Sequence, residues 1–292
     1  MEIIERILDR VPAWPLRRPS PLVTVLRLDG VIGHISGFRR GLSLSSQAAA
    51  IDKAFRPRNL VAVALSVNSP GGSAVQSALI AKRIRDLADE NDIPVIAFAE
   101  DIAASGGYWL ACAGDEIYAN ESSIIGSIGV VSGGFGFAEL IKKMGVERRL
   151  HTAGDKKAML DPFTPEKPAD VKHLKSLQRE IHETFTEMVR ARRGERLIGA
   201  DKNIFSGAFW TGRKALEMGL IDGIGDLRSV MRARFGERVR LRLVGVQRPL
   251  WRRRFGIAER SSGGFDFAYT ENLAADVLAA IEERLIWNRF GL

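Results

Sequence analysis

The sequence predicts an α/β fold with a mainly parallel core sheet, and three observations support this class. Apolar stretches of strand length alternate with segments of helical periodicity from residue 22 to residue 113. Each apolar stretch ends in a turn that opens a helix, as in the connections between parallel strands. The 292 residues are 46% hydrophobic and 27% charged, an ordinary globular composition with enough apolar surface for a large core.

The expected elements follow along the chain. Apolar residues at helical spacing predict an amphipathic helix over 3–11, and several prolines after it predict an extended linker up to residue 21. The expected strands are 23–32, 60–67, 94–99 (followed by a turn at 100–104) and 146–151. The expected helices are 45–55, 74–89, one ending at 113, 137–144, 165–195, 211–219 and 272–287. We therefore divide the chain into segment 1–21, a main domain over 22–235, and segment 236–292 with a strand, a basic stretch and an amphipathic helix.

Composition excludes several classes of function. A lone cysteine, Cys112, rules out a disulfide framework, and four histidines without ligand spacing argue against a metal site. The uncharged run 59–81 is interrupted by Asn68-Ser69-Pro70-Gly71-Gly72, so we expect no transmembrane helix, and the charged start is unlike a signal peptide. The net charge of +8 comes without a nucleic-acid recognition motif. We expect a cytoplasmic protein that needs no metal or other cofactor and binds no nucleic acid.

Two glycine-rich turns follow neighbouring predicted strands, where the active site of a parallel α/β sheet belongs. The first contains Gly71 and Gly72, whose N–H groups can approach an anion. The second, Ala103-Ala104-Ser105-Gly106-Gly107-Tyr108, places one serine among small residues at a helix start. Ser105 alone would more often be a helix N-cap. Together the turns can supply a nucleophile and oxyanion donors, which is what acyl transfer requires.

A serine nucleophile needs a base, and the residues leave three candidates. His151 ends an expected edge strand, with no evident carboxylate to orient it. Lys156 and Lys157 follow Gly154, and a lysine serves as base when burial keeps it neutral. A solvated lysine pair is the ordinary interpretation of that loop.

With these residues in view, the chain resembles peptidase family S49, the signal peptide peptidase A family, and particularly its short single-domain members of the SohB type. Five motifs stand in the family's order over residues 22–230: 67–72, 103–108, Ile125-Gly126-Ser127-Ile128-Gly129-Val130, the Gly-x-x-Lys of Gly154 to Lys157, and Phe209-Trp210-Thr211-Gly212 with the glycines that follow. The main domain 22–235 would be the peptidase domain.

The resemblance implies a ClpP/crotonase-like spiral fold and a serine peptidase with a Ser–Lys dyad. By position, Ser105 carries over as nucleophile and Lys157 as general base, with Lys156 as the neighbour onto which a one-residue slip would move the role. The amides of Gly106 and of Gly71 or Gly72 would form the oxyanion hole. The implied substrates are apolar peptides such as signal-peptide remnants, cut through an acyl-enzyme. A homo-oligomeric ring, with each site shared between subunits, is also implied.

Alternatives stay open at this stage. The same fold serves crotonase-type acyl-CoA enzymes, and a catalytically silent scaffold would keep the fold without activity. The chain lacks the N-terminal membrane anchor of many family members. Leu250-Trp251-Arg252-Arg253-Arg254-Phe255 is interpreted as a surface arginine cluster, with peripheral membrane contact as the alternative.

Overall fold

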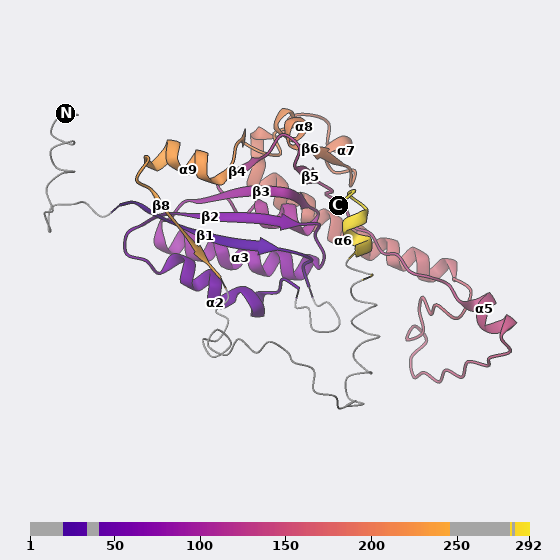
Figure 1. Ribbon diagram of the computed structural model, residues 1–292. Helices are drawn as coiled ribbons and strands as arrows, with labels where there is room; N and C mark the ends of the chain where they lie inside the picture. Colours follow the sequence, from indigo (N-terminus) through magenta and orange to yellow (C-terminus); the bar gives the residue numbers. More distant parts are fainter. Residues whose placement is uncertain (1–19, 34–40, 246–280, 282–283) are drawn as a thin grey trace, which may run out of the picture.

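A central sheet organises the molecule, seen in a computed structural model that describes residues 20–33, 41–245, 281 and 284–292. The strand order is β6-β5-β3-β2-β1-β8, and β4 pairs with β3 and β7 (Figure 1). The strands are β1 Leu22–Asp29, β2 Leu60–Ser69, β3 Val95–Ala104, β4 Glu116–Ala119, β5 Ile124–Gly126, β6 Phe209–Thr211, β7 Gly223–Ile224 and β8 Arg240–Val244. The helices are α2 Leu44–Phe55, α3 Ala74–Asn91, α4 Gly106–Ala111, α5 Ala138–Lys143, α6 Pro168–Arg193, α7 Asp201–Ile204, α8 Gly212–Glu217 and α9 Leu227–Phe235, with a 3-10 turn at Gly194–Arg196.

The sheet is apolar on both faces because helices cover both, as parallel sheets require. Side chains of β1 alternate, with Leu26 and Leu28 in a cluster against α2 and α3 and Val23 and Val25 in a second cluster against α9. Pairing within β1–β2, β2–β3, β3–β4 and β3–β5 is parallel, whereas β5–β6 is antiparallel. The predicted class, an α/β fold with a mainly parallel sheet, is confirmed.

Strand β3 extends further than the sequence pattern predicts. The expected turn at 100–104 is wrong, since β3 continues to Ala104. Past the point where β4 stops, Ile102–Ala104 pair with β5, and the Ile102 N–H donates to the Asn68 side chain. Glu100 and Asp101 interrupt the apolar run but lie exposed, and Glu100 accepts a hydrogen bond from Ser66. Pairing partners distant in the chain thus override the local polar signal.

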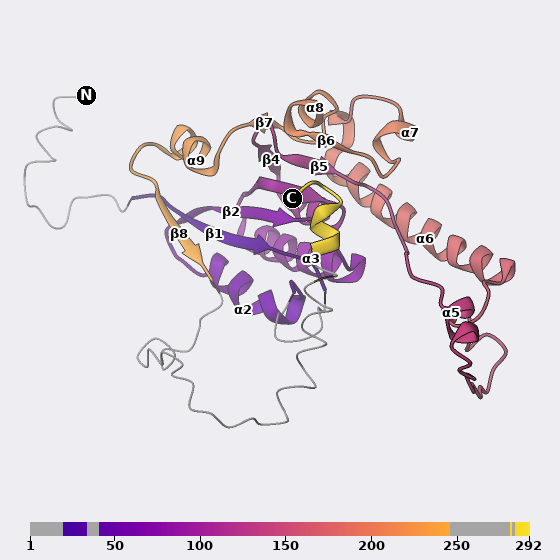
Figure 2. The same cartoon turned by 45° about the vertical axis from the view of Figure 1, so that its right-hand side comes forward.

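The predicted strand over 146–151 is also wrong. These residues are exposed and adopt no regular structure, because no neighbouring strand in the described part of the chain pairs with them. They belong to the segment 130–167 between β5 and α6, which we call the arm. The arm carries α5 and projects away from the sheet beside α6 in both views (Figures 1 and 2).

Several sequence predictions fall outside the described residues. These are the helix over 3–11, almost all of the proline linker and the basic stretch 250–255. Of the expected C-terminal helix 272–287, only residues 281 and 284–287 are described, and they are helical. Among the described helices, none combines the length and apolar character needed to cross a bilayer.

Candidate active site

Ser105 lies at the carboxyl end of β3, between the strand and α4. Its backbone is held on both sides, because the Ser105 N–H donates to Gly126 O at 2.8 Å and its carbonyl accepts from Trp109 N at 3.0 Å. The first bond ties Ser105 to the end of β5, and the second closes the first turn of α4. The serine is therefore fixed at the edge of the sheet where parallel strands end.

The backbone of Ser105 is strained in the way expected of a sharp strand-to-helix turn. Its φ of 52° and ψ of −123° lie in a region that non-glycine residues rarely adopt. Such a conformation costs on the order of 1–3 kcal/mol and persists only where the surroundings enforce it. The hydroxyl makes no capping hydrogen bond to α4. The ordinary interpretation of Ser105 as a helix N-cap is thus not what the structure shows.

Gly71 and Gly72 pass directly beside this serine. Both have positive φ, 106° and 140°, and a Cβ added at Gly71 would lie 2.8 Å from the Ser105 Cβ and 2.9 Å from Gly106 N. A Cβ added at Gly72 would meet the carbonyl oxygen of Ile32. No other residue type fits either position, and the two sequence-predicted turns meet at Ser105.

The amide groups around Ser105 differ in their availability. The Gly71 N–H donates to the Ser69 hydroxyl at 3.2 Å and is already engaged. In the part of the chain that the structure describes, Gly72 N–H and Gly106 N–H donate to no protein acceptor. Gly72 N lies 3.4 Å from the position that a Cβ at Gly106 would take, so these two amides are neighbours. A pair of free N–H groups beside a hydroxyl can stabilise a developing oxyanion.

The single chain does not bring the predicted lysine base to the serine. Lys156, Lys157 and His151 are all exposed residues of the arm, which points away from the sheet (Figure 2). None of the three lines the cavity into which Ser105 opens. The structure therefore unites Ser105, Gly71, Gly72 and Gly106 and leaves Lys157 apart from them.

The cavity at Ser105 has a volume of about 1670 Å³. Its walls come from the turn before α3, from α4, from the chain after β5, from α6 and from residues 285–290. One wall carries Ser127, a second serine with positive φ (53°), and His182, whose Nε2 lies 3.2 Å from Ile128 O. Sequence analysis did not single out the lining residues of α6. Their signal was available, since Lys172, Lys175 and Arg179 are spaced to share one helix face.

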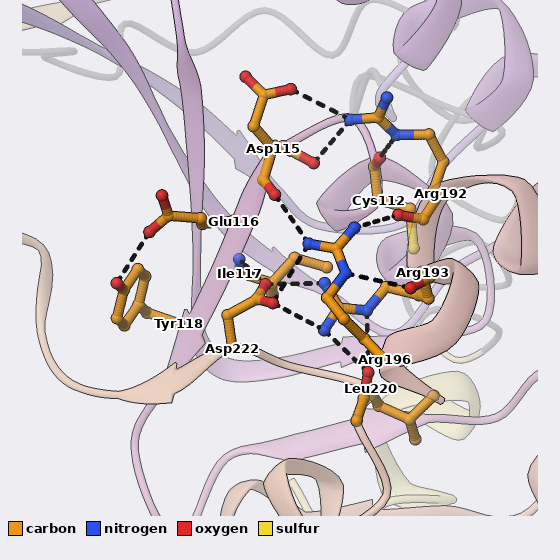
Figure 3. A network of polar contacts seen from close by, with 12 residues as sticks. Cys112, Asp115, Glu116, Ile117, Tyr118, Arg192, Arg193, Arg196, Leu220 and Asp222 are labelled. Carbon is orange, nitrogen blue, oxygen red and sulfur yellow. Dashed lines mark hydrogen bonds and ion pairs between the residues drawn. The ribbon is translucent and has the colours of Figure 1, made fainter. Parts of the chain in front are cut away.

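A buried polar network anchors the helix that follows the nucleophile (Figure 3). The Tyr108 hydroxyl on α4 donates to Leu220 O at 2.7 Å. The Arg193 side chain at the end of α6 is 2% exposed and donates to both carboxylate oxygens of Asp222, at 2.7 and 3.1 Å, and to Gly219 O. The network joins α4, α6 and the 219–222 segment into one unit.

The same network shifts the pKa values of its members. Burial would raise the pKa of Asp222, but the Arg193 hydrogen bond, the Ile117 N–H and nearby guanidinium charge outweigh it and hold that pKa below its usual value. Burial raises the pKa of the Tyr108 hydroxyl well above its usual value and that of the Cys112 thiol to about 11. These groups keep one charge state around neutral pH, consistent with a structural role. Among the described residues, no group of three His, Cys, Asp or Glu side chains could hold a metal ion.

The fold and this site define a class of protein: an α/β hydrolase-like scaffold with an exposed serine beside free amides at the end of a parallel strand. Comparison with known proteins gives the family. The model of peptidase family S49 matches residues 88–237, about half of the chain. The chain belongs to this family, and it is a peptidase with the ClpP/crotonase-like fold that the motifs predicted.

Individual relatives agree in part. The chain is 30% identical over 212 residues to a protease of Synechocystis, with 73% of each covered, and 30% identical over 215 residues to the chloroplastic serine protease SPPA of Arabidopsis thaliana, covering 70% of this chain and 31% of that one. It is 52% identical over 289 residues to a Brucella abortus protein named Na(+)/H(+) antiporter NhaA, covering 98% of this chain and 39% of the relative. The chain thus spans about two fifths of that longer protein. A solved structure of the membrane-bound stomatin-specific protease 1510-N aligns with 79% of the chain at a TM-score of 0.49 and 17% identity.

Proposed function

We propose that the chain is a serine endopeptidase in which Ser105 is the nucleophile. The observation that carries this proposal is the strained Ser105 turn, whose hydroxyl does not cap α4 and opens into the cavity. Energy stored in a backbone that β3, β5 and α4 enforce is typical of a functional site. A strand-to-helix turn with the serine at its apex presents Oγ to a bound peptide.

In the proposed reaction, Ser105 Oγ attacks the scissile carbonyl carbon and forms a tetrahedral intermediate. The N–H groups of Gly72 and Gly106 stabilise its oxyanion, because both are adjacent to Ser105 and free of protein acceptors in the described chain. Gly71 instead shapes the turn, since its N–H is bound to Ser69. The intermediate expels the amine and leaves an acyl-enzyme, which water then hydrolyses.

Lys157 is the proposed general base, and a neighbouring copy of the chain supplies it. It would take the proton of Ser105, pass it to the leaving amine and later activate water. Within one chain Lys157 is exposed on the arm and absent from the cavity of Ser105. An exposed lysine is charged at neutral pH, so the role requires burial against another surface.

The arm has the character of an interface between copies. It exposes apolar side chains that a monomer would bury, among them Phe135 at 77%, Met144 at 67% and Leu140 at 52%. A homo-oligomeric ring in which each arm docks beside the Ser105 of the next subunit would bury these residues and bring Lys157 into the site.

A cytoplasmic location with peripheral membrane contact and apolar peptides as substrates complete the proposal. The apolar side chains of the cavity, such as Trp109 and Phe185, support the substrate class. The Brucella relative, named as an antiporter, supports proximity to a membrane. Flotation with anionic liposomes tests that contact, and protein left entirely in the bottom fraction would exclude it.

The decisive experiment measures hydrolysis of a quenched apolar peptide by the wild type, Ser105→Ala, Lys157→Ala, Lys156→Ala and a co-refolded mixture of Ser105→Ala with Lys157→Ala. We expect activity to vanish in the Ser105 and Lys157 variants, to persist in Lys156→Ala, and to return in the mixture. Full activity of Lys157→Ala would overturn the dyad and direct attention to His151. A folded wild type without hydrolytic activity would contradict the peptidase mechanism, and a thioester assay would then test the acyl-CoA alternative.

A further inference from the structure

The charge on the wall of the Ser105 cavity is one-sided. Of the described residues that line it, four are cationic, namely Lys172, Lys175, Arg179 and Arg289, and only Glu166 is acidic. Three of the four cations come from α6. The cavity wall opposite Ser105 therefore presents net positive charge to whatever enters.

The three α6 cations form a continuous strip, which we call the basic strip. Lys172, Lys175 and Arg179 are three and four residues apart, so they lie on one face of the helix, and all three are exposed. Within the described part of the chain none of them takes part in an ion pair. The glutamates later in the same helix, at 180, 183 and 187, do not line the cavity. The charge of the basic strip is thus left unneutralised where it faces the site.

A second part of the cavity is apolar. Trp109 of α4 stacks on Phe185 of α6 with ring centroids 4.8 Å apart, and Ile181 and Phe290 line the same space. Trp109 lies one helical turn after Ser105, so the apolar part adjoins the nucleophile. The basic strip lies further toward the beginning of α6.

We propose that the preferred substrates are peptides in which acidic side chains flank the apolar segment that Ser105 cleaves, with the basic strip binding the carboxylates. This proposal rests on the proposed peptidase function and names its substrate class. Seven residues of helix from Lys172 to Arg179 span about 10 Å, the length of about three residues of extended peptide. The basic strip therefore matches a short run of aspartate or glutamate.

The test compares two quenched peptides with the same apolar core, one flanked by three glutamates and one by three glutamines, each made with the flank on either side of the core. The ratio of their kcat/KM values is measured for the wild type and for the triple variant Lys172→Gln, Lys175→Gln, Arg179→Gln. A control variant with Lys53→Gln, Lys82→Gln and Lys214→Gln removes the same charge from exposed sites outside the cavity.

We expect the wild type to prefer the glutamate peptide by about tenfold at low ionic strength, the sum of three exposed ion pairs. The preference should shrink in 0.5 M NaCl, where the Debye length is only a few ångströms. The triple variant should lose the preference, and the control should keep it. Equal rates on both peptides by the wild type, or an unchanged ratio in the triple variant, would overturn the proposal. An unchanged ratio together with altered sedimentation would assign the basic strip to a contact with a second copy.

Failure of the peptidase function itself gives a different result, namely that neither peptide is cut. The proposal is then decided by binding, using fluorescence anisotropy of the two labelled peptides with the Ser105→Ala protein. Tighter binding of the glutamate peptide that the triple variant abolishes would support the basic strip as its site. Equal affinities would exclude it.

Discussion

Replacing Asp222 by alanine tests whether the buried Arg193–Asp222 pair holds the sheet edge to α6. The substitution removes two charge-assisted hydrogen bonds from Arg193, whose side chain is 2% exposed, and removes the acceptor of the Ile117 N–H. The guanidinium keeps only Gly219 O as an acceptor in this part of the network. Leaving a buried charge without its partner costs about 3–5 kcal/mol.

The assay is thermal unfolding at fixed protein concentration, because assembly would make Tm depend on concentration. For a domain of this size each kcal/mol lowers Tm by about 2–4 °C, so Asp222→Ala should lower it by about 6–20 °C. The matched control is Glu121→Ala, which removes a carboxylate from an exposed ion pair with Arg213. That pair is expected to contribute less than about 1 kcal/mol.

Two results would refute this reasoning. The first is a loss in Asp222→Ala no larger than that in Glu121→Ala. The second is a double variant, Arg193→Met with Asp222→Ala, that is less stable than Asp222→Ala alone, because removing the uncompensated guanidinium should recover part of the loss. The pH dependence provides a further check. Since the pKa of Asp222 is lowered on folding, its contribution is present above the unfolded value of about 3.9 and disappears as the pH falls through the folded pKa.

Three further predictions follow from the neighbourhood of Ser105. Because its φ is 52°, Ser105→Gly should unfold with about 1 kcal/mol more free energy than Ser105→Ala in denaturant titrations, and equal stabilities would contradict the strain. Tyr108→Phe should lower stability by about 1–3 kcal/mol because Leu220 O loses its buried donor, whereas Tyr118→Phe, at a partly exposed hydroxyl, should change it less. Cys112 should resist a thiol reagent at pH 8 in the folded protein and react once it is unfolded, because burial raises its pKa to about 11.

Much of the core could be predicted because its signals are local. Leu60–Ser69 is a nearly uninterrupted apolar run, and Ser73 supplies the cap that starts α3, so the boundaries expected there differ from the structure by only a few residues. Short-range signals failed where partners are distant. The polar pair Glu100 and Asp101 suggested a turn, but pairing of Ile102–Ala104 with β5 keeps the chain extended. The alternation over 146–151 suggested a strand, but no neighbouring strand in the described chain pairs with it.

The site divides in the same way. The serine and the glycines were identifiable, because a small-residue turn at a strand end restricts which residue types fit. The strain at Ser105, the engagement of the Gly71 amide by Ser69 and the position of α6 over the cavity could not be read from spacing. They depend on which elements pack together.

The sequence by itself determined the α/β class, the family motifs and the identity of Ser105 as the candidate nucleophile, because periodicity and turn chemistry act over a few residues. Only the tertiary structure decided which amides remain free beside that serine, that the basic strip of α6 faces it, and that Lys157 lies apart from it in a single chain. Those facts depend on contacts between residues tens of positions apart, and their geometry is set by packing rather than by local preference.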